Sequence, residues 1–306
     1  MRRKIPGTMA LLAFEMAARH ESFTRAAEAL SLTQSAVCRQ IAGLESFLGV
    51  RLFRRTRRGV KLTDAGLSYS RRISARLDAV ERDTLSVMAH HGRGAAIELA
   101  VVPTFATRWL LPRLGDFQER NPDVRVNLTT RTRPFLFDDT EFDAAVYFGD
   151  AGWPGTEAHY LMRENPVPVC SPRRLQGGTL LTAAEISALP LLQQTTRPYA
   201  WRQWFEAQGM RLEHDMSGTR LELFTMLAEA ASHDMGIALI PPFLIRDELE
   251  SGRLVVANEH RLLTDKAYYL IIPERKAETD ALKCFSDWLR DEAAGYRETE
   301  RLGDPG

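Results

Sequence analysis

Four side chains that can bind nucleic-acid bases share one face of a predicted helix over residues 34–48. At about 100° per residue, the apolar face comprises Val37, Ile41, Leu44 and Leu48, and the polar face comprises Gln34, Ser35, Cys38 and Arg39. Glutamine can pair bidentately with adenine, arginine with guanine, and serine with base edges or phosphate. The pattern therefore predicts a helix that reads the DNA major groove. An ordinary amphipathic helix with a solvated polar face would show the same pattern.

The elements before and after this helix would position it. Helices are predicted over residues 9–19 and 25–30, the second capped by Thr24, while Thr33 caps the third and Gly49 ends it. Two helices joined by a short turn form a helix-turn-helix, whose second helix is the reader. An arginine-rich stretch with strand-like ends about Gly59 follows, and four of its arginines are Arg54, Arg55, Arg57 and Arg58. These arginines are either DNA contacts or a solvated charge run.

The charge of the chain is divided between its two parts. Residues 1–92 carry 16 Lys and Arg against 8 Asp and Glu, and the rest carries 24 against 32, so that the formal net charge at pH 7 is zero. Such asymmetry indicates a polyanion-binding end, although a chance excess of surface arginine would give the same balance. With 44% hydrophobic and 26% charged residues, the 306-residue chain is an ordinary globular one, which excludes a disordered protein. Three widely spaced cysteines argue against a disulfide framework.

A long helix and then alternating strands and helices are predicted after the basic segment. The helix covers residues 64–91, and its apolar stripe comprises Tyr69, Ile73, Leu77, Val80, Thr84 and Val87. This stripe would pack against a partner helix or against the body of the same chain. A hinge is expected at residues 91–95. From Ala96 onward the order of elements predicts α/β sheets with helices on both faces.

The N-terminal motifs resemble those of a known family. The run from Ser22 to Glu45 (SFTRAAEALSLTQSAVCRQIAGLE), followed by LGVRLFRR at residues 48–55 and LTDAG at residues 62–66, closely resembles the LysR-type transcriptional regulators. The resemblance implies an all-α winged helix-turn-helix N-terminal domain, a long linker helix, then an α/β two-lobed periplasmic-binding-protein-like effector domain. The expected bounds are 6–63, 64–91 and 95–295, with lobe I at about 95–165 and 267–295 and lobe II at about 166–266.

The resemblance also implies which residues bind DNA. The helix-turn-helix would span about residues 23–42, and the arginines after it would lie on a wing beside the DNA backbone. The expected DNA-binding residues are Thr33, Gln34, Ser35, Cys38, Arg39, Arg54, Arg55 and Arg58. The family usually has serine where this chain has Cys38, and a thiol is a weak hydrogen-bond donor. A redox-sensing thiol is the alternative role for Cys38.

Several later segments are similar to a subgroup that contains the glycine-cleavage activator and the β-lactamase regulator. A small effector would bind outside the carboxyl ends of the strands, where free backbone N–H groups and hydroxyls meet. The expected effector-binding residues are Thr104, Phe105, Thr129, Thr130, Tyr147, Phe148, Gln194, Thr195 and Trp201. Each of them could instead be a strand-end packing residue.

The chemical class of the effector is suggested by the aromatic residues near these strand ends. They are Phe105, Trp109, Tyr147, Phe148, Trp153, Tyr199, Trp201 and Trp204, and together they could form a cage for a cation. The second half of the chain also resembles regulators of choline-sulfate utilisation. A choline sulfate-like ligand would suit both an aromatic cage and a helix N-terminus.

The functional expectation is a cytoplasmic bacterial regulator of transcription. It would be a homodimer or homotetramer that binds double-stranded promoter DNA and a small effector, with RNA polymerase as a partner if it activates transcription. No membrane partner, metal or cofactor is expected. The nucleophile elbow, P-loop, dinucleotide and zinc-protease motifs are absent, which argues against an enzyme. The alternatives are a cytoplasmic solute-binding module and a non-specific architectural DNA binder.

Overall fold

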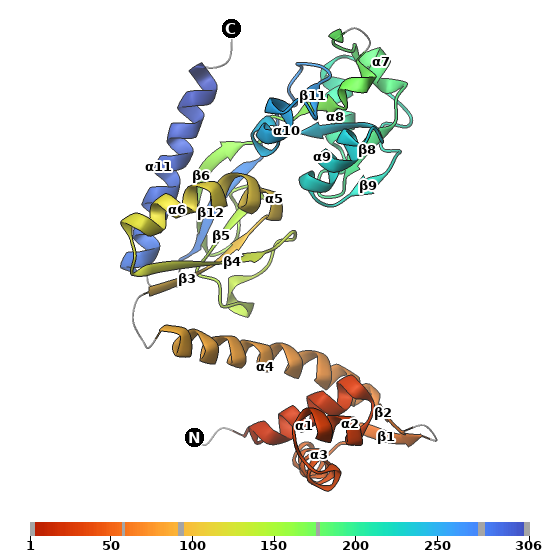
Figure 1. Cartoon of the computed structure of the whole chain (residues 1–306), viewed down its shortest axis with the longest axis vertical. Coiled ribbons are helices and arrows are strands. Elements are labelled where there is room, and N and C mark those ends of the chain that lie inside the picture. Colours follow the sequence, from red (N-terminus) through yellow and green to blue (C-terminus); the bar gives the residue numbers. More distant parts are fainter. Residues whose placement is uncertain (1–3, 57–58, 91–94, 176–177, 275–278, 303–306) are drawn as a thin grey trace. The chain divides into compact units, whose positions relative to one another are not determined.

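The computed structural model describes the chain except residues 1–3, 57–58, 91–94, 176–177, 275–278 and 303–306. The chain divides into two compact units, Met1–Arg93 and Gly94–Gly306 (Figure 1). Across the described residues, the helices are too short or too polar to cross a bilayer.

The N-terminal unit is a small helical core with a two-stranded wing and a long final helix. Its elements are α1 (Thr8–His20), α2 (Phe23–Ala29), α3 (Gln34–Leu48), β1 (Phe53–Thr56), β2 (Gly59–Leu62) and α4 (Asp64–His90). The first three helices pack around Ala13, Ala26, Val37 and Ile41, each at most 3% exposed. Because two of these side chains are alanine, the helices can approach closely enough for the tight helix-turn-helix crossing.

The caps of α2 and α3 decide where these two helices begin and end. The prediction that Thr24 caps α2 is wrong: Ser22 is the cap, and its Oγ accepts a hydrogen bond from the Arg25 backbone N–H at 3.3 Å. The extended backbone of Ser22 leaves its hydroxyl free to serve the first turn, so the helix begins at Phe23. At α3 the predicted caps are confirmed, because Thr33 Oγ1 accepts from the Ala36 N–H at 3.2 Å and Gly49 adopts φ 70°.

A buried carboxylate joins the wing to α3. Glu45 is 8% exposed, and its Oε1 accepts hydrogen bonds from the backbone N–H groups of Leu52 at 2.7 Å and Phe53 at 3.1 Å. Its Oε2 accepts from Arg51 at 3.0 Å. On the other side of the wing, a Cβ on Gly66 would lie 2.1 Å from the Leu52 carbonyl oxygen, so only glycine allows α4 to begin there. These contacts fix where β1 starts relative to α3.

The second unit contains two five-stranded sheets. The first has the order β4-β3-β5-β12-β6, with β3 parallel to β4 and β5, and β12 antiparallel to β5 and β6. Its strands are β3 (Ala95–Val101), β4 (Val124–Thr130), β5 (Ala144–Gly149), β6 (Thr156–Arg163) and β12 (Ala267–Pro273). A continuous helical run after β3 consists of α5 (Pro103–Phe105), the π-helical turn η1 (Ala106–Leu110) and α6 (Leu111–Arg120). Lobe I also contains the 3₁₀ turn η2 (Phe137–Asp139) and α11 (Asp280–Leu302).

The second sheet has the order β11-β7-β10-β8-β9 and forms lobe II. Its strands are β7 (Val167–Cys170), β8 (Leu191–Gln194), β9 (Arg220–Leu221), β10 (Ile237–Ile240) and β11 (Val255–Val256). Its helices are α7 (Ala183–Ser187), α8 (Ala200–Ala207), α9 (Phe224–Ser232) and α10 (Arg246–Glu250), with the 3₁₀ turns η3 (Pro172–Arg174) and η5 (Pro242–Leu244). The chain passes from lobe I to lobe II after β6 and returns before β12.

Three strands have the bounds that the sequence pattern predicts. The pattern predicts strands over residues 124–130, 167–170 and 237–240, and the structure confirms these bounds for β4, β7 and β10. The pattern does not predict strand β6, which lies at the edge of its sheet and exposes Glu157, Tyr160 and Arg163. The sequence also predicts a closing helix over residues 279–294, and in the structure this helix, α11, continues to Leu302.

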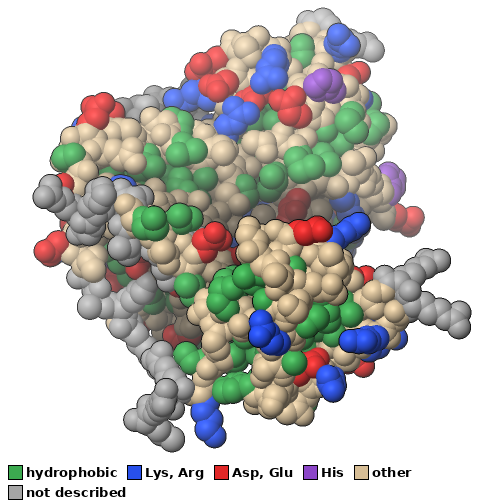
Figure 2. Space-filling view, turned by 60° about the horizontal axis from the view of Figure 1, so that its bottom comes forward, with side chains coloured by type: hydrophobic (Ala, Val, Ile, Leu, Met, Phe, Trp, Pro, Cys, Tyr) green, Lys and Arg blue, Asp and Glu red, His purple; other side chains and the backbone are tan. Residues whose placement is uncertain are grey.

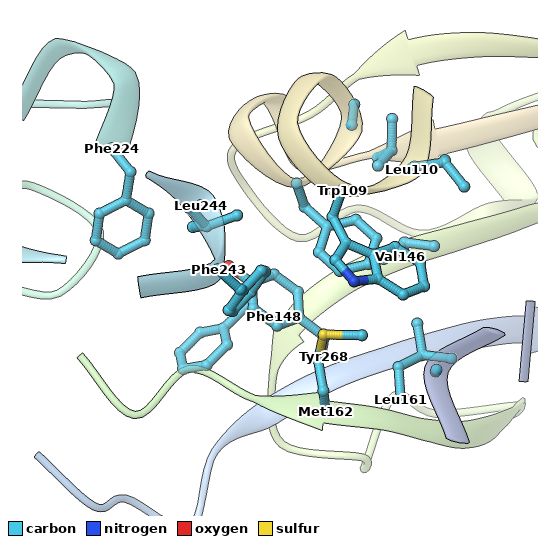
Figure 3. Close-up of a cluster of buried hydrophobic side chains, with 14 of the residues drawn as sticks. Trp109, Leu110, Val146, Phe148, Leu161, Met162, Phe224, Phe243, Leu244 and Tyr268 are labelled. Atoms are coloured by element: carbon cyan, nitrogen blue, oxygen red, sulfur yellow. The ribbon is translucent and has the colours of Figure 1, made fainter. Parts of the chain in front are cut away.

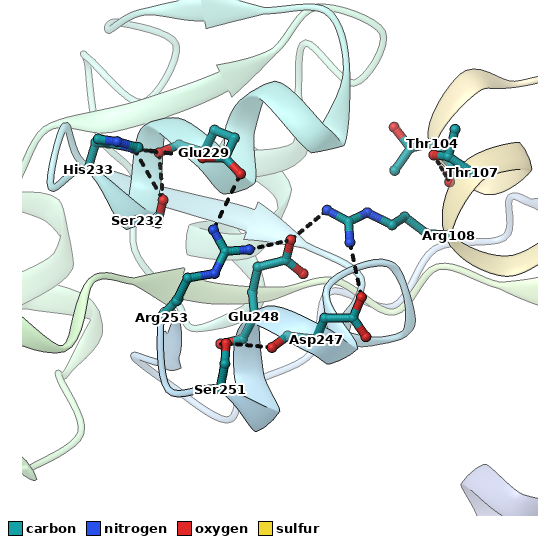
Figure 4. A network of polar contacts seen from close by, with 10 residues as sticks. All are labelled: Thr104, Thr107, Arg108, Glu229, Ser232, His233, Asp247, Glu248, Ser251 and Arg253. Carbon is teal, nitrogen blue, oxygen red and sulfur yellow. Dashed lines mark hydrogen bonds and ion pairs between the residues drawn. The ribbon is translucent and has the colours of Figure 1, made fainter. Parts of the chain in front are cut away.

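The two lobes are packed together through an apolar seam and a charged network. Phe243 of η5 lies 6.5 Å from Phe105 and 6.0 Å from Tyr268 between ring centroids, within a buried cluster that draws residues from both sheets (Figure 3). Beside this seam, Arg108 of lobe I donates to Glu248 of lobe II at 2.5 Å, and Arg253 donates to the same oxygen at 3.2 Å (Figure 4). Because Glu248 is 1% exposed, separating the lobes would break the buried ion pair between Glu248 and Arg108.

Candidate DNA-binding face and effector cleft

The polar face predicted for α3 is present and open. Thr33, Gln34, Ser35 and Arg39 are exposed and Cys38 is half-buried, whereas Val37, Ile41 and Leu44 on the opposite face are at most 3% exposed. Thr33 Oγ1 and Ser35 Oγ lie 3.1 Å apart at the start of the helix. The helix therefore presents an amide, a guanidinium and short hydroxyl side chains together on its outer side.

The described wing arginines are also exposed. Arg54 and Arg55 lie on β1, which pairs antiparallel with β2 so that Arg54 lies opposite Lys61. Arg58, together with Arg57, lies outside the described residues. Figure 2 shows Lys and Arg side chains among hydrophobic and uncharged ones on the face of the N-terminal unit that is turned forward. The wing thus places two basic side chains beside a polar helix.

The apolar stripe predicted on α4 divides into two parts. Tyr69, at the start, packs on Phe14 of α1 with ring centroids 5.4 Å apart, so this end binds the body of the same chain. Ile73 and Leu77 are half-buried, Thr84 is exposed, and Val80 is 58% exposed. The side chain of Val87 lies outside the described residues. Leu85 and Met88 are 56% and 66% exposed, so the far part of the helix carries apolar side chains that the described N-terminal unit leaves uncovered.

A cleft between the two lobes contains five of the nine predicted effector residues. Thr104, Phe105, Tyr147, Phe148 and Gln194 line it, and so do other residues of both lobes: Val102, Pro103, Thr132, Thr196, Arg197, Glu222, Leu223, Phe224 and Tyr268. Its cavity volume is about 40 Å³. Hydroxyl and amide groups therefore meet in the cleft, but it is nearly closed, with room for little more than ordered water.

The other four predicted effector residues lie outside this cleft. Thr129 and Thr130 end β4 and are exposed, and Thr195 is exposed after β8. Trp201 is 2% exposed, and its indole N–H donates to the Leu192 carbonyl at 2.9 Å. Parallel strands do bring their ends to one edge of a sheet. The spacing of residues along the sequence, however, does not show in which direction each of these four side chains points.

Arg197, which lines the cleft, forms an ion pair with the buried Glu164 that was not predicted from the sequence. Arg197 Nε and Nη2 donate to the two carboxylate oxygens of Glu164 at 3.0 Å and 2.6 Å, and Tyr268 donates its hydroxyl to Glu164 at 2.7 Å. Burial lowers the pKa of the Arg197 guanidinium, but the adjoining Glu164 carboxylate outweighs that effect and the pKa is raised. Burial, reinforced by Glu164, raises the pKa of Tyr268 well above its ordinary value. These three residues lie far apart in the sequence, and no spacing pattern connects them.

The predicted aromatic cage does not form. Trp109 is 1% exposed and stacks on Phe105 inside lobe I, and the Trp204 indole donates to the His260 carbonyl within lobe II. The Arg197 guanidinium lies 3.7 Å from the centre of the Phe148 ring, so it occupies an aromatic face that a cationic ligand would need. These aromatic residues are large core side chains of two separate lobes, and their number near strand ends reflected packing.

The three cysteines occupy different environments. Cys38 is half-buried, Cys284 is exposed and Cys170 is buried, and none of them forms a disulfide. Burial raises the pKa of the Cys170 thiol to about 11. Among the described residues, no cluster of three or more His, Cys, Asp or Glu side chains suits a metal ion.

Comparisons with known proteins place this fold in a family. Residues 9–67 match the bacterial regulatory helix-turn-helix protein, lysR family, and residues 90–294 match the LysR substrate binding domain. The chain is 35% identical over 304 residues to the glycine cleavage system transcriptional activator of Escherichia coli (strain K12), with 99% of each chain covered.

Solved structures agree with this assignment. The effector domain of AmpR of Pseudomonas aeruginosa matches at 29% identity with a TM-score of 0.62, covering 68% of this chain and all of that one. Full-length CbnR, solved with its target DNA, has the same fold at 20% identity and a TM-score of 0.70, covering 93% of this chain and 99% of that one. The chain thus belongs to the LysR family of DNA-binding transcriptional regulators, which combine a helix-turn-helix domain with an effector-binding domain.

Proposed function

We propose that the exposed polar face of α3 reads base edges in the major groove of promoter DNA. The observation that carries this proposal is the sharp division of α3 between exposed Gln34, Ser35 and Arg39 and buried Val37 and Ile41. Gln34 and Arg39 supply bidentate base contacts, and Thr33, Ser35 and Cys38 approach the backbone or base edges. Arg54, Arg55 and Arg58 neutralise phosphates from the wing. The site of action is the bacterial cytoplasm, and the protein works by binding, without catalysis.

The DNA-binding proposal is tested by footprinting the full-length protein on DNA upstream of its own and neighbouring genes. A protected, roughly two-fold symmetric site is expected, and Arg39→Ala should need about 5- to 150-fold more protein to protect it, while weak binding to unrelated DNA remains. Equal binding of wild type and Arg39→Ala to the site would overturn the assignment of α3 as the reader.

We further propose that α4 pairs with the same helix of a second chain. The exposed apolar side chains Val80, Leu85 and Met88 support this arrangement, since isolated helices seldom leave such side chains in water. A dimer, or a dimer of dimers, would present two readers to a symmetric site, and RNA polymerase would be a further partner if the protein activates transcription. Light scattering of wild type and Leu85→Glu should show a loss of assembly in the variant. A monomeric wild type would contradict the proposal.

The interlobe cleft is the proposed effector site. Thr104 opens the helical run 103–120, whose first N–H groups favour an anionic group, while the exposed Glu222 carboxylate lies on the other lobe. One wall thus favours a negatively charged group and the other a positively charged group. This arrangement suits a small zwitterion, a class that includes glycine, betaine and choline sulfate. Because the cleft volume is about 40 Å³, a ligand of this kind must bind an arrangement with the lobes further apart, which couples binding to a change of shape.

Isothermal titration of the full-length protein tests this class directly. We expect heat with one of glycine, betaine or choline sulfate, and a loss of that heat in Thr104→Val. Choline, which lacks the anionic end, should bind at least tenfold more weakly. An absence of heat with all four compounds would rule out the zwitterion.

A further inference from the structure

A second and larger cavity lies beside the cleft, on the other side of Arg197. Its volume is about 500 Å³, against about 40 Å³ for the cleft, and it shares with the cleft only Phe148, Gln194, Thr196, Arg197 and Phe224. Small-molecule sites in proteins measure roughly 300–1,000 Å³. The larger cavity, here called the α8 chamber, is therefore the one of the two that already has the size of a ligand site.

The wall between the cleft and the α8 chamber is held in place by the chain itself. All three guanidinium nitrogens of Arg197 are engaged: Nε and Nη2 by Glu164, and Nη1 by the Thr196 hydroxyl at 2.8 Å and the Thr196 carbonyl at 3.2 Å. Its flat face rests on Phe148 at 3.7 Å. Arg197 lines both spaces, and because it is fully paired it offers no free charge to an anionic ligand.

The α8 chamber is lined mainly by apolar and aromatic side chains. Helix α8 contributes one face at helical spacing, with Ala200, Gln203 and Ala207, and β8 and β10 contribute Leu192 and Leu239. Further apolar lining residues are Phe148, Pro166, Pro198, Tyr199, Trp201, Phe224, Leu262 and Leu263. The charged lining residues, Asp150, Glu164, Arg197, Asp265 and Lys266, include both signs in nearly equal number. This lining suits an uncharged, mostly apolar molecule.

One polar group at the chamber lacks a partner. Gln194 is 7% exposed and lines both cavities, and its buried Oε1 has no hydrogen-bond partner among the described residues. A buried amide oxygen without a donor is unfavourable, so a ligand that supplies an N–H or O–H group would be favoured over one that does not. The chamber would therefore select, among mostly apolar molecules, those that carry a hydrogen-bond donor.

We infer that the α8 chamber is a second small-molecule site, separate from the interlobe cleft, which takes an uncharged aromatic molecule bearing a hydrogen-bond donor that pairs with Gln194. Flat aromatic rings match the volume and the apolar lining, and an amide N–H matches the unpaired oxygen. Thr104 and Glu222 line the cleft but not the chamber. The proposal for the chamber can therefore hold even if the cleft is not the effector site.

The test uses benzamide and N,N-dimethylbenzamide, in which methyl groups replace the two amide N–H donors. We expect benzamide to bind the full-length protein and the dimethyl compound to bind at least about tenfold more weakly, as measured by calorimetry and ligand-detected NMR. Ala207→Trp, at an exposed position of the lining, should block benzamide, and Ala200→Phe provides a second block. Gln194→Met should reduce the preference for benzamide to about twofold or less.

Thr104→Val, which alters only the cleft, is the matched control and should leave benzamide binding unchanged. Loss of benzamide binding in Thr104→Val but not in Ala207→Trp would place the compound in the cleft and overturn the second site. Equal affinities of the two benzamides for the wild type would also overturn it, because Gln194 would then play no part. No binding of either compound at millimolar concentration would do the same.

Discussion

The two units of this regulator differ in whether the polar side chains of their candidate sites are exposed or buried and paired. On α3, Gln34 and Arg39 are exposed to solvent, whereas in the effector unit Glu164 is 4% exposed and fully engaged with Arg197 and Tyr268. The N-terminal unit can therefore meet DNA without rearranging its side chains. The effector unit must break or bypass existing contacts before a ligand enters the cleft. We therefore propose that DNA reading is preformed, whereas effector binding is the step coupled to movement.

The largest predicted effect concerns the buried ion pair of the effector unit. Arg197→Met would leave the Glu164 carboxylate buried without its ion partner, so we expect the effector unit to lose about 3 kcal/mol of stability in urea unfolding. Glu164→Gln combined with Arg197→Met should recover a large part of that loss. Arg120→Met, at an exposed arginine, is the control. A loss below about 1 kcal/mol in the single variant would show that the pair is not important for stability.

Single substitutions on the exposed face of α3 test whether its residues read bases. Arg39→Ala and Gln34→Ala should each weaken binding to the footprinted site by about 5- to 150-fold, with little effect on folding, because each removes one bidentate base contact. Fluorescence anisotropy on the specific site and on a scrambled duplex separates specific from general binding. Arg120→Ala removes one surface positive charge outside the N-terminal unit and should change neither. An equal loss on both duplexes would mean that these residues contact only phosphates.

Glu45 sharpens the comparison, because it is a buried carboxylate in the DNA-binding unit. Glu45→Gln weakens the acceptor for the Leu52 and Phe53 N–H groups, and the start of the wing should loosen. We expect binding to fall by about fivefold on every sequence alike, roughly the effect of one weakened hydrogen bond. Glu28→Gln, on an exposed acidic residue of α2, is the matched control. A loss confined to the specific site would contradict a role in placing the wing.

A smaller effect is expected for a wing arginine. Arg54→Ala should weaken binding to all sequences and lower the slope of log affinity against log salt by about one, because one phosphate contact is lost. Arg58→Ala is expected to act in the same way. Titrations at several salt concentrations measure the slope. An unchanged slope would assign Arg54 to the solvated surface.

The smallest effect concerns thiol reactivity. At pH 8 we expect iodoacetamide to label Cys284 readily and Cys170 not at all in the folded protein, because Cys170 is buried and its pKa of about 11 leaves only roughly one thiolate in a thousand. Mass spectrometry of the labelled peptides distinguishes them. Labelling of Cys170 as fast as that of Cys284 would mean that lobe II opens readily.

Local patterns revealed the exposed site, and long-range packing hid much of the buried one. The face of α3 repeats with the helical period, so Val37, Ile41 and the residues opposite them could be assigned from spacing alone. In the cleft, Thr104 and Gln194 were found because they follow strand ends. Arg197 and Glu164 could not be found, because their pairing depends on how two lobes meet. The expected cage failed for the same reason: Trp109 and Trp204 fill two different cores.

The most direct test of the central claim is footprinting of the full-length protein on DNA upstream of its own and neighbouring genes, with the Gln34→Ala and Arg39→Ala variants beside it. We predict a protected, pseudo-palindromic site that both variants lose while their weak general affinity for DNA remains. Uniform binding to all fragments at physiological salt, or protection that the two variants retain, would contradict a regulator that reads its promoter through α3.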